Sequence, residues 1–184
     1  TKSKKKQQGF KMADWAEKHV PELLKRTYDT PEAGELRKKF FIESDLNGNK
    51  LLSFCEVQKG IRDVLHNDDL YKATQAIKRA FDMAKNSEAS ESVHGEDYID
   101  PNEGRFFFQS LITSYRYWLR FKKMDKNHDN RVELVEYKEA HGNGGNGDAE
   151  QQFKDMDVNK GGYILYDEWY NYNVKHEALF DFLD

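Results

Sequence analysis

The chain has 184 residues, of which 34% are charged and 14% are aromatic, with a formal net charge of −4. So many aromatic residues exclude a disordered chain, because disordered segments lack the apolar groups that form a core. No apolar run reaches the length of a membrane-spanning helix, and no signal-peptide pattern opens the sequence. The mild charge says little about partners, and we expect no nucleic acid among them. The one cysteine, Cys55, cannot form an internal disulfide, which predicts a cytoplasmic protein.

Residues 1–30 are expected to form a basic N-terminal arm followed by a helix. The arm, Thr1 to Gly9, is polar and rich in lysine, which indicates a solvated segment. The alternative is contact with an anionic membrane surface, where each lysine contributes about 1 kcal/mol. Stable anchoring would need an acyl chain as well, and the chain has no Met-Gly start. Phe10 to Tyr28 carries the apolar spacing of a helix.

The segment Asp45–Glu56, which we call loop one, follows a helix predicted to begin at Pro31 and run to Ser44. Calcium prefers six to eight oxygen ligands, and a twelve-residue EF-hand loop supplies them from alternate positions. The candidate ligands of loop one follow that order, with a main-chain carbonyl at position 7: Asp45, Asn47, Asn49, Leu51, Ser53 and Glu56. Lys50 occupies position 6, where a glycine belongs, and a left-handed lysine costs about 1–2 kcal/mol. A weaker site is therefore predicted.

A second loop, residues 92–103, follows a predicted helix from Leu70 to Lys85 that Asp68 or Asp69 would cap. Counting back from Ile99 at position 8 and Glu103 at position 12 identifies the residues at the first donor positions: Ser92, His94 and Glu96. The first carboxylate is missing and the polar segment is too long for one twelve-residue loop. We therefore expect a helix–loop–helix unit that binds no calcium but pairs with loop one.

Residues 104–124 are strongly apolar and aromatic, which is typical of core. The alternative is an aromatic pocket for a small ligand. The segment must hold the helix after loop two and the helix before the next loop. A helix break is expected near Thr113 or Ser114.

Loop three, Asp125–Glu136, matches the calcium-loop order best. Its candidate ligands include four acidic side chains and one main-chain carbonyl: Asp125, Asn127, Asp129, Arg131, Glu133 and Glu136. Asn130 replaces the usual glycine at position 6, and asparagine tolerates positive φ. The sequence therefore predicts the strongest calcium site here.

Loop four, Asp157–Glu168, follows a helix at residues 134–140, a glycine-rich hinge and a second helix capped by Asp148. Its candidate ligands are again placed at alternate positions: Asp157, Asn159, Gly161, Tyr163 and Glu168. Gly161 and Leu165 offer no side-chain oxygen, so water would complete the shell and the site would be weaker. The apolar C-terminal residues either pack back onto the protein or form an exposed docking segment.

Together these segments predict an all-α fold with four EF-hand helix–loop–helix units in two paired lobes. The expected domains are the arm and helix at 1–30, an N-terminal pair at 31–112 and a C-terminal pair at 113–184. Within each pair, the residues at position 8 should form a short antiparallel β bridge. Leu52 would pair with Ile99, and Val132 with Ile164.

The chain resembles the calmodulin-related EF-hand superfamily, and within it the flagellar calcium-binding proteins of trypanosomes, the calflagins. The resemblance rests on Lys78–Asp82 before the degenerate second loop, on Met124–Lys126, and on Glu133–Leu134 with Tyr137–Ala140, and spans roughly residues 32–175. Calflagins are acylated at an N-terminal glycine and cysteine and join the flagellar membrane in response to calcium. This chain begins at Thr1 without that cysteine. The flagellar and membrane location that the resemblance implies is therefore expected only if the anchor has been truncated.

Three functions compete at this point. The first is a Ca²⁺ sensor that changes conformation to engage a protein or membrane partner. The second is a calcium buffer or structural protein that does not open. The third is a small-ligand carrier, or an enzyme that uses the aromatic interior. We expect no enzyme, because the six histidines lack metalloenzyme spacing and no nucleophile motif is present.

Overall fold

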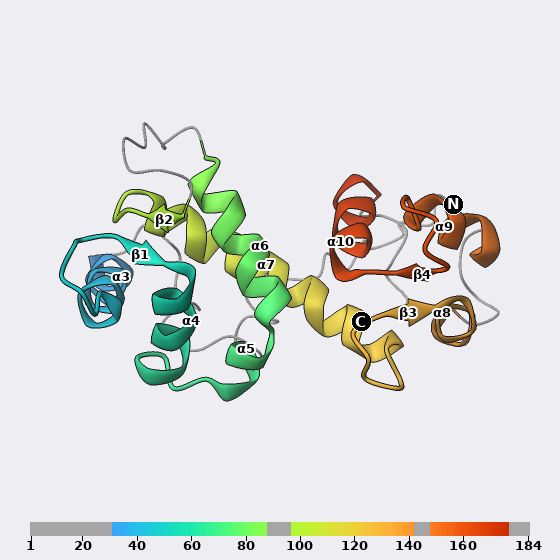
Figure 1. The fold of residues 1–184 in the computed structure, drawn as a ribbon, viewed down its shortest axis with the longest axis horizontal. Coiled ribbons are helices and arrows are strands. Elements are labelled where there is room, and N and C mark those ends of the chain that lie inside the picture. The colour runs from blue at the N-terminus through green and yellow to red at the C-terminus, as the bar shows by residue number, and fades with distance from the viewer. Residues whose placement is uncertain (1–30, 88–96, 142–147, 177–184) are drawn as a thin grey trace, which may run out of the picture.

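The structure, a computed structural model, describes residues 31–87, 97–141 and 148–176, and these are mainly helical (Figure 1). The helices are α3 Pro31–Ser44, α4 Phe54–Asp63, α5 Asp68–Lys72, α6 Thr74–Lys85, α7 Glu103–Met124, α8 Leu134–His141, α9 Ala149–Met156 and α10 Tyr166–Lys175. The strands are β1 Leu52–Ser53, β2 Tyr98–Ile99, β3 Val132–Glu133 and β4 Tyr163–Ile164. The predictions for the N-terminal arm and its helix, for Ser92, His94 and Glu96, and for the C-terminal tail lie outside the described residues.

The short strands pair two by two, as predicted. β1 pairs antiparallel with β2, with Leu52 opposite Ile99. β3 pairs antiparallel with β4, with Val132 opposite Ile164. All four of these apolar residues are fully buried, so each bridge packs against the core. The prediction of a mostly helical fold with short antiparallel bridges is confirmed.

The predicted helix break near Thr113 or Ser114 is wrong. Helix α7 runs without interruption from Glu103 to Met124, 22 residues, and joins the N-terminal half of the molecule to the C-terminal half (Figure 1). The Thr113 hydroxyl donates to the Gln109 carbonyl one turn earlier at 3.5 Å, a bond that a helix accommodates. One helix therefore both leaves loop two and leads into loop three, and the expected boundary after residue 112 falls inside it.

The predicted helix at residues 70–85 is divided in two. The cap is neither Asp68 nor Asp69 but Asn67, whose side-chain oxygen accepts the Leu70 N–H at 2.8 Å. The chain leaves helical geometry at Ala73, where ψ is 49°, and α6 begins at Thr74. Ala73 is fully buried, so packing of the bend against the core explains what local propensity did not predict.

The core is aromatic and continuous across both halves. Phe40 meets Phe108 edge to face with ring centres 5.1 Å apart, while Tyr166 meets Trp118 at 5.4 Å. The Tyr166 hydroxyl donates to the Ser114 carbonyl of α7 at 2.5 Å. The aromatic segment of α7 is thus core, as the sequence indicated. None of the helices that the structure describes is long and apolar enough to cross a membrane.

Candidate metal-binding loops

Loops one, three and four share one backbone conformation. In each of them, positions 4 and 6 adopt positive φ: Gly48 and Lys50, His128 and Asn130, and Lys160 and Gly162. At position 6 the values are 64°, 65° and 81° for Lys50, Asn130 and Gly162. The turn that the motif requires therefore forms whether position 6 is glycine, asparagine or lysine. Loop four alone has the glycine, which adopts this φ without strain.

The position-1 aspartate organises each turn. In loop three, Asp125 Oδ1 accepts the Asp129 N–H and Oδ2 accepts the Asn130 N–H, both at 3.1 Å. Loop one repeats this with Asp45, whose Oδ2 accepts the Lys50 N–H at 2.8 Å. Loop four repeats it with Asp157 and the N–H of Gly162 at 2.9 Å. The carboxylate thus holds the backbone at positions 5 and 6.

The position-12 glutamate closes each loop from the other side. Glu136 Oε2 accepts the Glu133 N–H at 2.9 Å, and its Oε1 accepts the Lys126 N–H at 2.9 Å. Glu56 bonds the N–H of Ser53, and Glu168 that of Leu165, in the same way. One carboxylate therefore joins the start of each loop to the helix that follows it.

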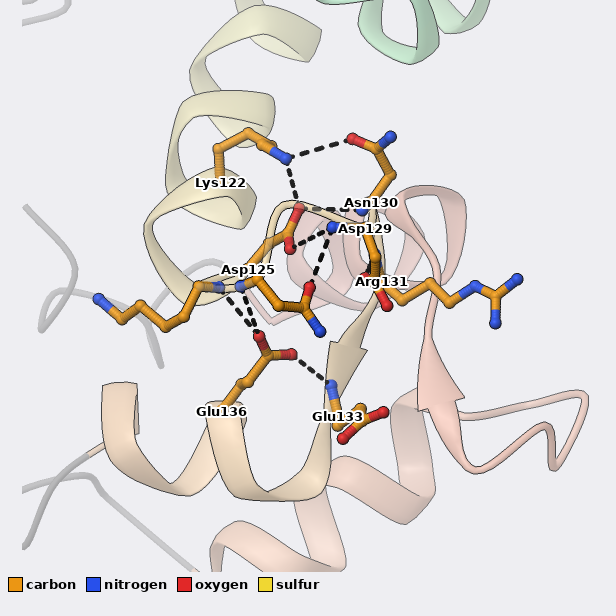
Figure 2. A network of polar contacts seen from close by, with 9 residues as sticks. Lys122, Asp125, Asp129, Asn130, Arg131, Glu133 and Glu136 are labelled. Carbon is orange, nitrogen blue, oxygen red and sulfur yellow. Dashed lines mark hydrogen bonds and ion pairs between the residues drawn. The ribbon is translucent and has the colours of Figure 1, made fainter.

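Loop three has the most acidic set of side chains, drawn in Figure 2. The Asp125 carboxylate is fully buried and Glu136 is 8% exposed, while the Asp129 and Glu133 side chains are exposed. The Asn127 side-chain oxygen accepts the Asp129 N–H at 3.0 Å. The Arg131 guanidinium lies 4.5 Å from the centre of the Tyr163 ring, so the two position-7 residues of loops three and four stack on each other.

Loop four lacks a ligand side chain at position 5, and its neighbour fills part of that space. A Cβ added to Gly161 would lie 2.7 Å from the Asn159 side-chain oxygen. The Asn159 side-chain oxygen therefore lies in part of the space that a position-5 side chain would occupy, while Glu168 Oε1 accepts the Asn159 N–H at 3.2 Å.

Loop two keeps its final turn. Glu103 Oε2 accepts the Asp100 N–H at 2.8 Å, the same bond that position 12 makes in the other loops. Glu103 is 1% exposed. Its earlier donor positions lie outside the described residues, so the prediction that loop two binds no calcium stays a prediction.

In loop three, the side-chain ligands other than Glu133 bond to N–H groups of their own loop, but the carboxylates of the described loops do not converge on one point. Among the described residues, no three His, Cys, Asp or Glu side chains are grouped closely enough to hold a metal. In loop one the Ser53 hydroxyl donates to Glu56 at 2.8 Å, and the Asn49 oxygen accepts the Leu51 N–H at 2.8 Å. The donor set nevertheless fits a hard cation, because every side-chain ligand presents oxygen and the first and last carboxylates of each loop face the same turn; in loop three both of these carboxylates are buried.

Lys122 is a residue of this region that the sequence reasoning missed. Its ammonium contacts Asp125 and also the Asn130 side-chain oxygen, the latter at 3.2 Å (Figure 2). The signal was present in the sequence: a lysine three residues before the loop, on the last turn of a helix, lies on the same face as the loop's first residue.

Comparison with known proteins agrees with the resemblance to calflagins. The model of the FCaBP EF-hand domain matches residues 19–111, half of the chain. Flagellar calcium-binding protein TB-44A of Trypanosoma brucei brucei is 30% identical over 145 residues, which are 75% of this chain and 36% of that protein. Flagellar calcium-binding protein TB-24 of the same organism is 29% identical over 145 residues, 75% of this chain and 66% of TB-24.

The chain spans about a third of the length of TB-44A and just under two thirds of TB-24. The family match covers the half of the molecule that contains loops one and two, while the aligned 145 residues extend the likeness over three quarters of the chain. With the loop geometry and the strand register described above, these matches confirm the expected kinship. The chain belongs to the FCaBP EF-hand domain family.

Proposed function

We propose that the protein binds calcium through its twelve-residue loops, with loop three as the strongest site. The observation that carries this is the buried pair Asp125 and Glu136, which close one turn from opposite sides. In loop three the ion would be held by the oxygens of Asp125, Asn127, Asp129, Arg131, Glu133 and Glu136. The relatives are flagellar calcium-binding proteins by name, which supports the same reading.

Loops one and four are proposed as weaker sites. In loop one the ligands would be Asp45, Asn47, Asn49, Leu51, Ser53 and Glu56. In loop four they would be Asp157, Asn159, Gly161, Tyr163 and Glu168, with water at positions 5 and 9. Two acidic side chains stand at ligand positions in each of these loops, against four in loop three. Fewer charges give weaker attraction for a divalent cation.

Calorimetric titration of the full chain with calcium tests this ranking. Glu136→Gln keeps the shape of the side chain but removes its charge, and should weaken the tightest site by at least about tenfold, since even outer-shell changes cost about 10–100-fold. Glu56→Gln and Glu168→Gln should affect weaker phases of the titration.

Glu139→Gln is the matched control, because Glu139 is an exposed glutamate on α8, the same helix that carries Glu136. Its titration should match that of the parent. If Glu136→Gln left the tightest phase intact, loop three would not be the strongest site.

The proposal extends to the whole architecture: four EF-hand units in two pairs, with loops one and two in one lobe and loops three and four in the other. The support is the β1–β2 and β3–β4 pairing and the position-12 bond that recurs at Glu103. In this reading loop two retains its fold and has lost its metal.

We also propose that calcium binding is read out as a change of conformation. The support is the contact between α10, which leaves loop four, and α6 of the other half. Arg79 on α6 pairs with Asp167 at 3.1 Å and lies 4.2 Å from the centre of the Tyr170 ring. Asp167 immediately precedes the ligand Glu168, so movement of Glu168 would be transmitted to α6.

A groove of about 710 Å³ lies beside this contact, lined by residues of α4, α6 and the start of α10 that include Phe54, Met83 and Tyr166. In the proposed change, rotation of α10 widens this groove and exposes more of its apolar lining. Calcium should therefore increase the fluorescence of a hydrophobic dye, and Glu168→Gln should reduce that increase.

The alternative function is a calcium buffer, which the already formed turns of loops one, three and four favour. Tight binding with an unchanged dye signal would support the buffer.

The partner and location are proposed from the same kinship. A protein target or an anionic membrane surface is the expected partner, with the lysine-rich N-terminal arm as the membrane contact. The relatives' names suggest a flagellar location. Binding of the full chain to vesicles with and without anionic lipid, at low and high salt, tests the membrane contact, because screening weakens electrostatic attraction.

A further inference from the structure

One lysine side chain links the helix before loop three to both ends of its turn (Figure 2). Lys122 lies in the last turn of α7, three residues before Asp125. Its ammonium donates to Asp125 Oδ2 and to Asn130 Oδ1, and it lies 5.6 Å from the centre of the Trp118 ring. That separation is within cation–π range. Positions 1 and 6 of the loop are thus connected through one ammonium.

The carboxylate that Lys122 contacts is out of reach of solvent. The Asp125 side chain is 0% exposed and the Lys122 side chain 25% exposed. A buried carboxylate is costly unless it has hydrogen bonds and an opposite charge. The N–H groups of Asp129 and Asn130 supply the bonds, and Lys122 is the cation that contacts it among the residues described.

The arrangement is specific to loop three within the described loops. The corresponding residue before loop one is Ile42, which is uncharged and 66% exposed. Before loop four it is Lys154, an exposed side chain that makes no ion pair with Asp157 in the described structure. Position 6 of loop four is Gly162, which has no side-chain oxygen to hold an ammonium. Among loops one, three and four, only loop three therefore combines a lysine three residues before the loop with a side-chain oxygen at position 6.

We propose that Lys122 is a positioning residue that sets the calcium affinity of loop three. The inference rests on the proposed calcium site. Without the ion, the ammonium neutralises Asp125 and steadies the turn at Asn130. A divalent cation on the same carboxylate repels the ammonium, which must then move or remain at a cost. Lys122 therefore stabilises the calcium-free protein and weakens binding of the ion.

The test is Lys122→Met in the full chain, which keeps an aliphatic stem beside Trp118 and removes the charge. Calorimetry should show calcium affinity at loop three about fivefold higher, since partly exposed ion pairs have modest free energies. In chelator, the melting temperature should fall by about 2–4 °C. The opposite signs are diagnostic, because simple structural damage would lower both the affinity and the melting temperature.

Two variants control for charge and for size. Lys126→Met removes an exposed lysine of the same loop, and its affinity should rise by less than about twofold at physiological salt, with no change in melting temperature. Lys122→Arg keeps the charge, and its calcium affinity should stay closer to that of the parent than the affinity of Lys122→Met does. In a double-mutant cycle with Asn130→Gly, the two effects should not add, since the side chains are in contact.

If Lys122→Met behaved like Lys126→Met, or lowered both affinity and melting temperature, the inference would be wrong. Failure of the calcium site itself would look different: Glu136→Gln and the parent would then give the same titration.

Discussion

At the scale of single residues, position 6 of the loops shows how a motif tolerates different side chains. Lys50, Asn130 and Gly162 all adopt positive φ, because the N–H at position 6 donates to the position-1 aspartate in each loop. The strain of a left-handed lysine is about 1–2 kcal/mol. A hydrogen bond to a charged acceptor contributes about 1.5–3 kcal/mol, which offsets this strain.

Lys50→Gly should therefore stabilise the protein. Relief of strain contributes about 1–2 kcal/mol. This exceeds the cost of about 0.4–1 kcal/mol that comes from the greater conformational entropy of glycine in the unfolded chain. The free energy of unfolding should rise by about 0.5–1 kcal/mol, measured by denaturant titration in chelator. Gly162→Ala, the reverse change at the same position of loop four, should lower it. A loss of stability in Lys50→Gly would mean that the lysine side chain makes a stabilising contact.

At the scale of elements, two glycines determine how closely the helices of the N-terminal half approach. A Cβ on Gly60 of α4 would lie 2.0 Å from the Ser44 hydroxyl oxygen of α3. A Cβ on Gly104 of α7 would lie 2.2 Å from the Phe41 ring. Both distances are far below contact, so α3 can pack against α4 and α7 only because these side chains are absent.

Gly60→Ala should destabilise the protein by about 1–3 kcal/mol, the usual cost of overpacking a core. Gly34→Ala is the matched control, because it lies in helix α3 and its added Cβ would meet nothing closer than 3.9 Å. That change should stabilise the helix by about 0.5–1 kcal/mol. Chemical denaturation of both variants measures the difference, and equal effects would contradict the close approach at Gly60.

At the scale of the whole molecule, α7 connects the two halves, and aromatic side chains of both halves pack against each other. Tyr117 of α7 meets Tyr170 of α10 edge to face at 5.1 Å, and the Tyr170 hydroxyl donates to the Met83 sulfur of α6 at 3.6 Å. Together with the Arg79–Asp167 ion pair, these contacts place α10, the helix that follows loop four, next to α6 and α7.

Buried tyrosines in both halves predict a loss of stability at alkaline pH. Burial, with a smaller effect of the nearby Asp69 charge, raises the pKa of Tyr115 to about 12. Burial likewise raises the pKa of Tyr137 and, strongly, that of Tyr166. The folded state holds these protons where the unfolded chain, with a tyrosine pKa of about 10, releases them.

The stabilising contribution is therefore fully present below about pH 10 and is lost as the pH rises toward about 12. For Tyr115 alone the loss is on the order of 2 kcal/mol. Denaturant titrations across this range should show the decline, and Tyr115→Phe should make it shallower. A stability that did not change up to about pH 12 would contradict the burial of these hydroxyl groups.

The sequence by itself determined the loops and their pairing. The order of oxygen-bearing residues and the apolar position 8 are local features, so they predicted the turns at Asp45, Asp125 and Asp157 and both strand registers. Only the tertiary structure decided that α7 is continuous, that Ala73 interrupts the helix before loop two, and that α10 packs against α6. These depend on which distant side chains share a core, and a local pattern does not carry that information. The same holds for Lys122: its charge was visible in the sequence, but only folding placed it between Asp125 and Asn130.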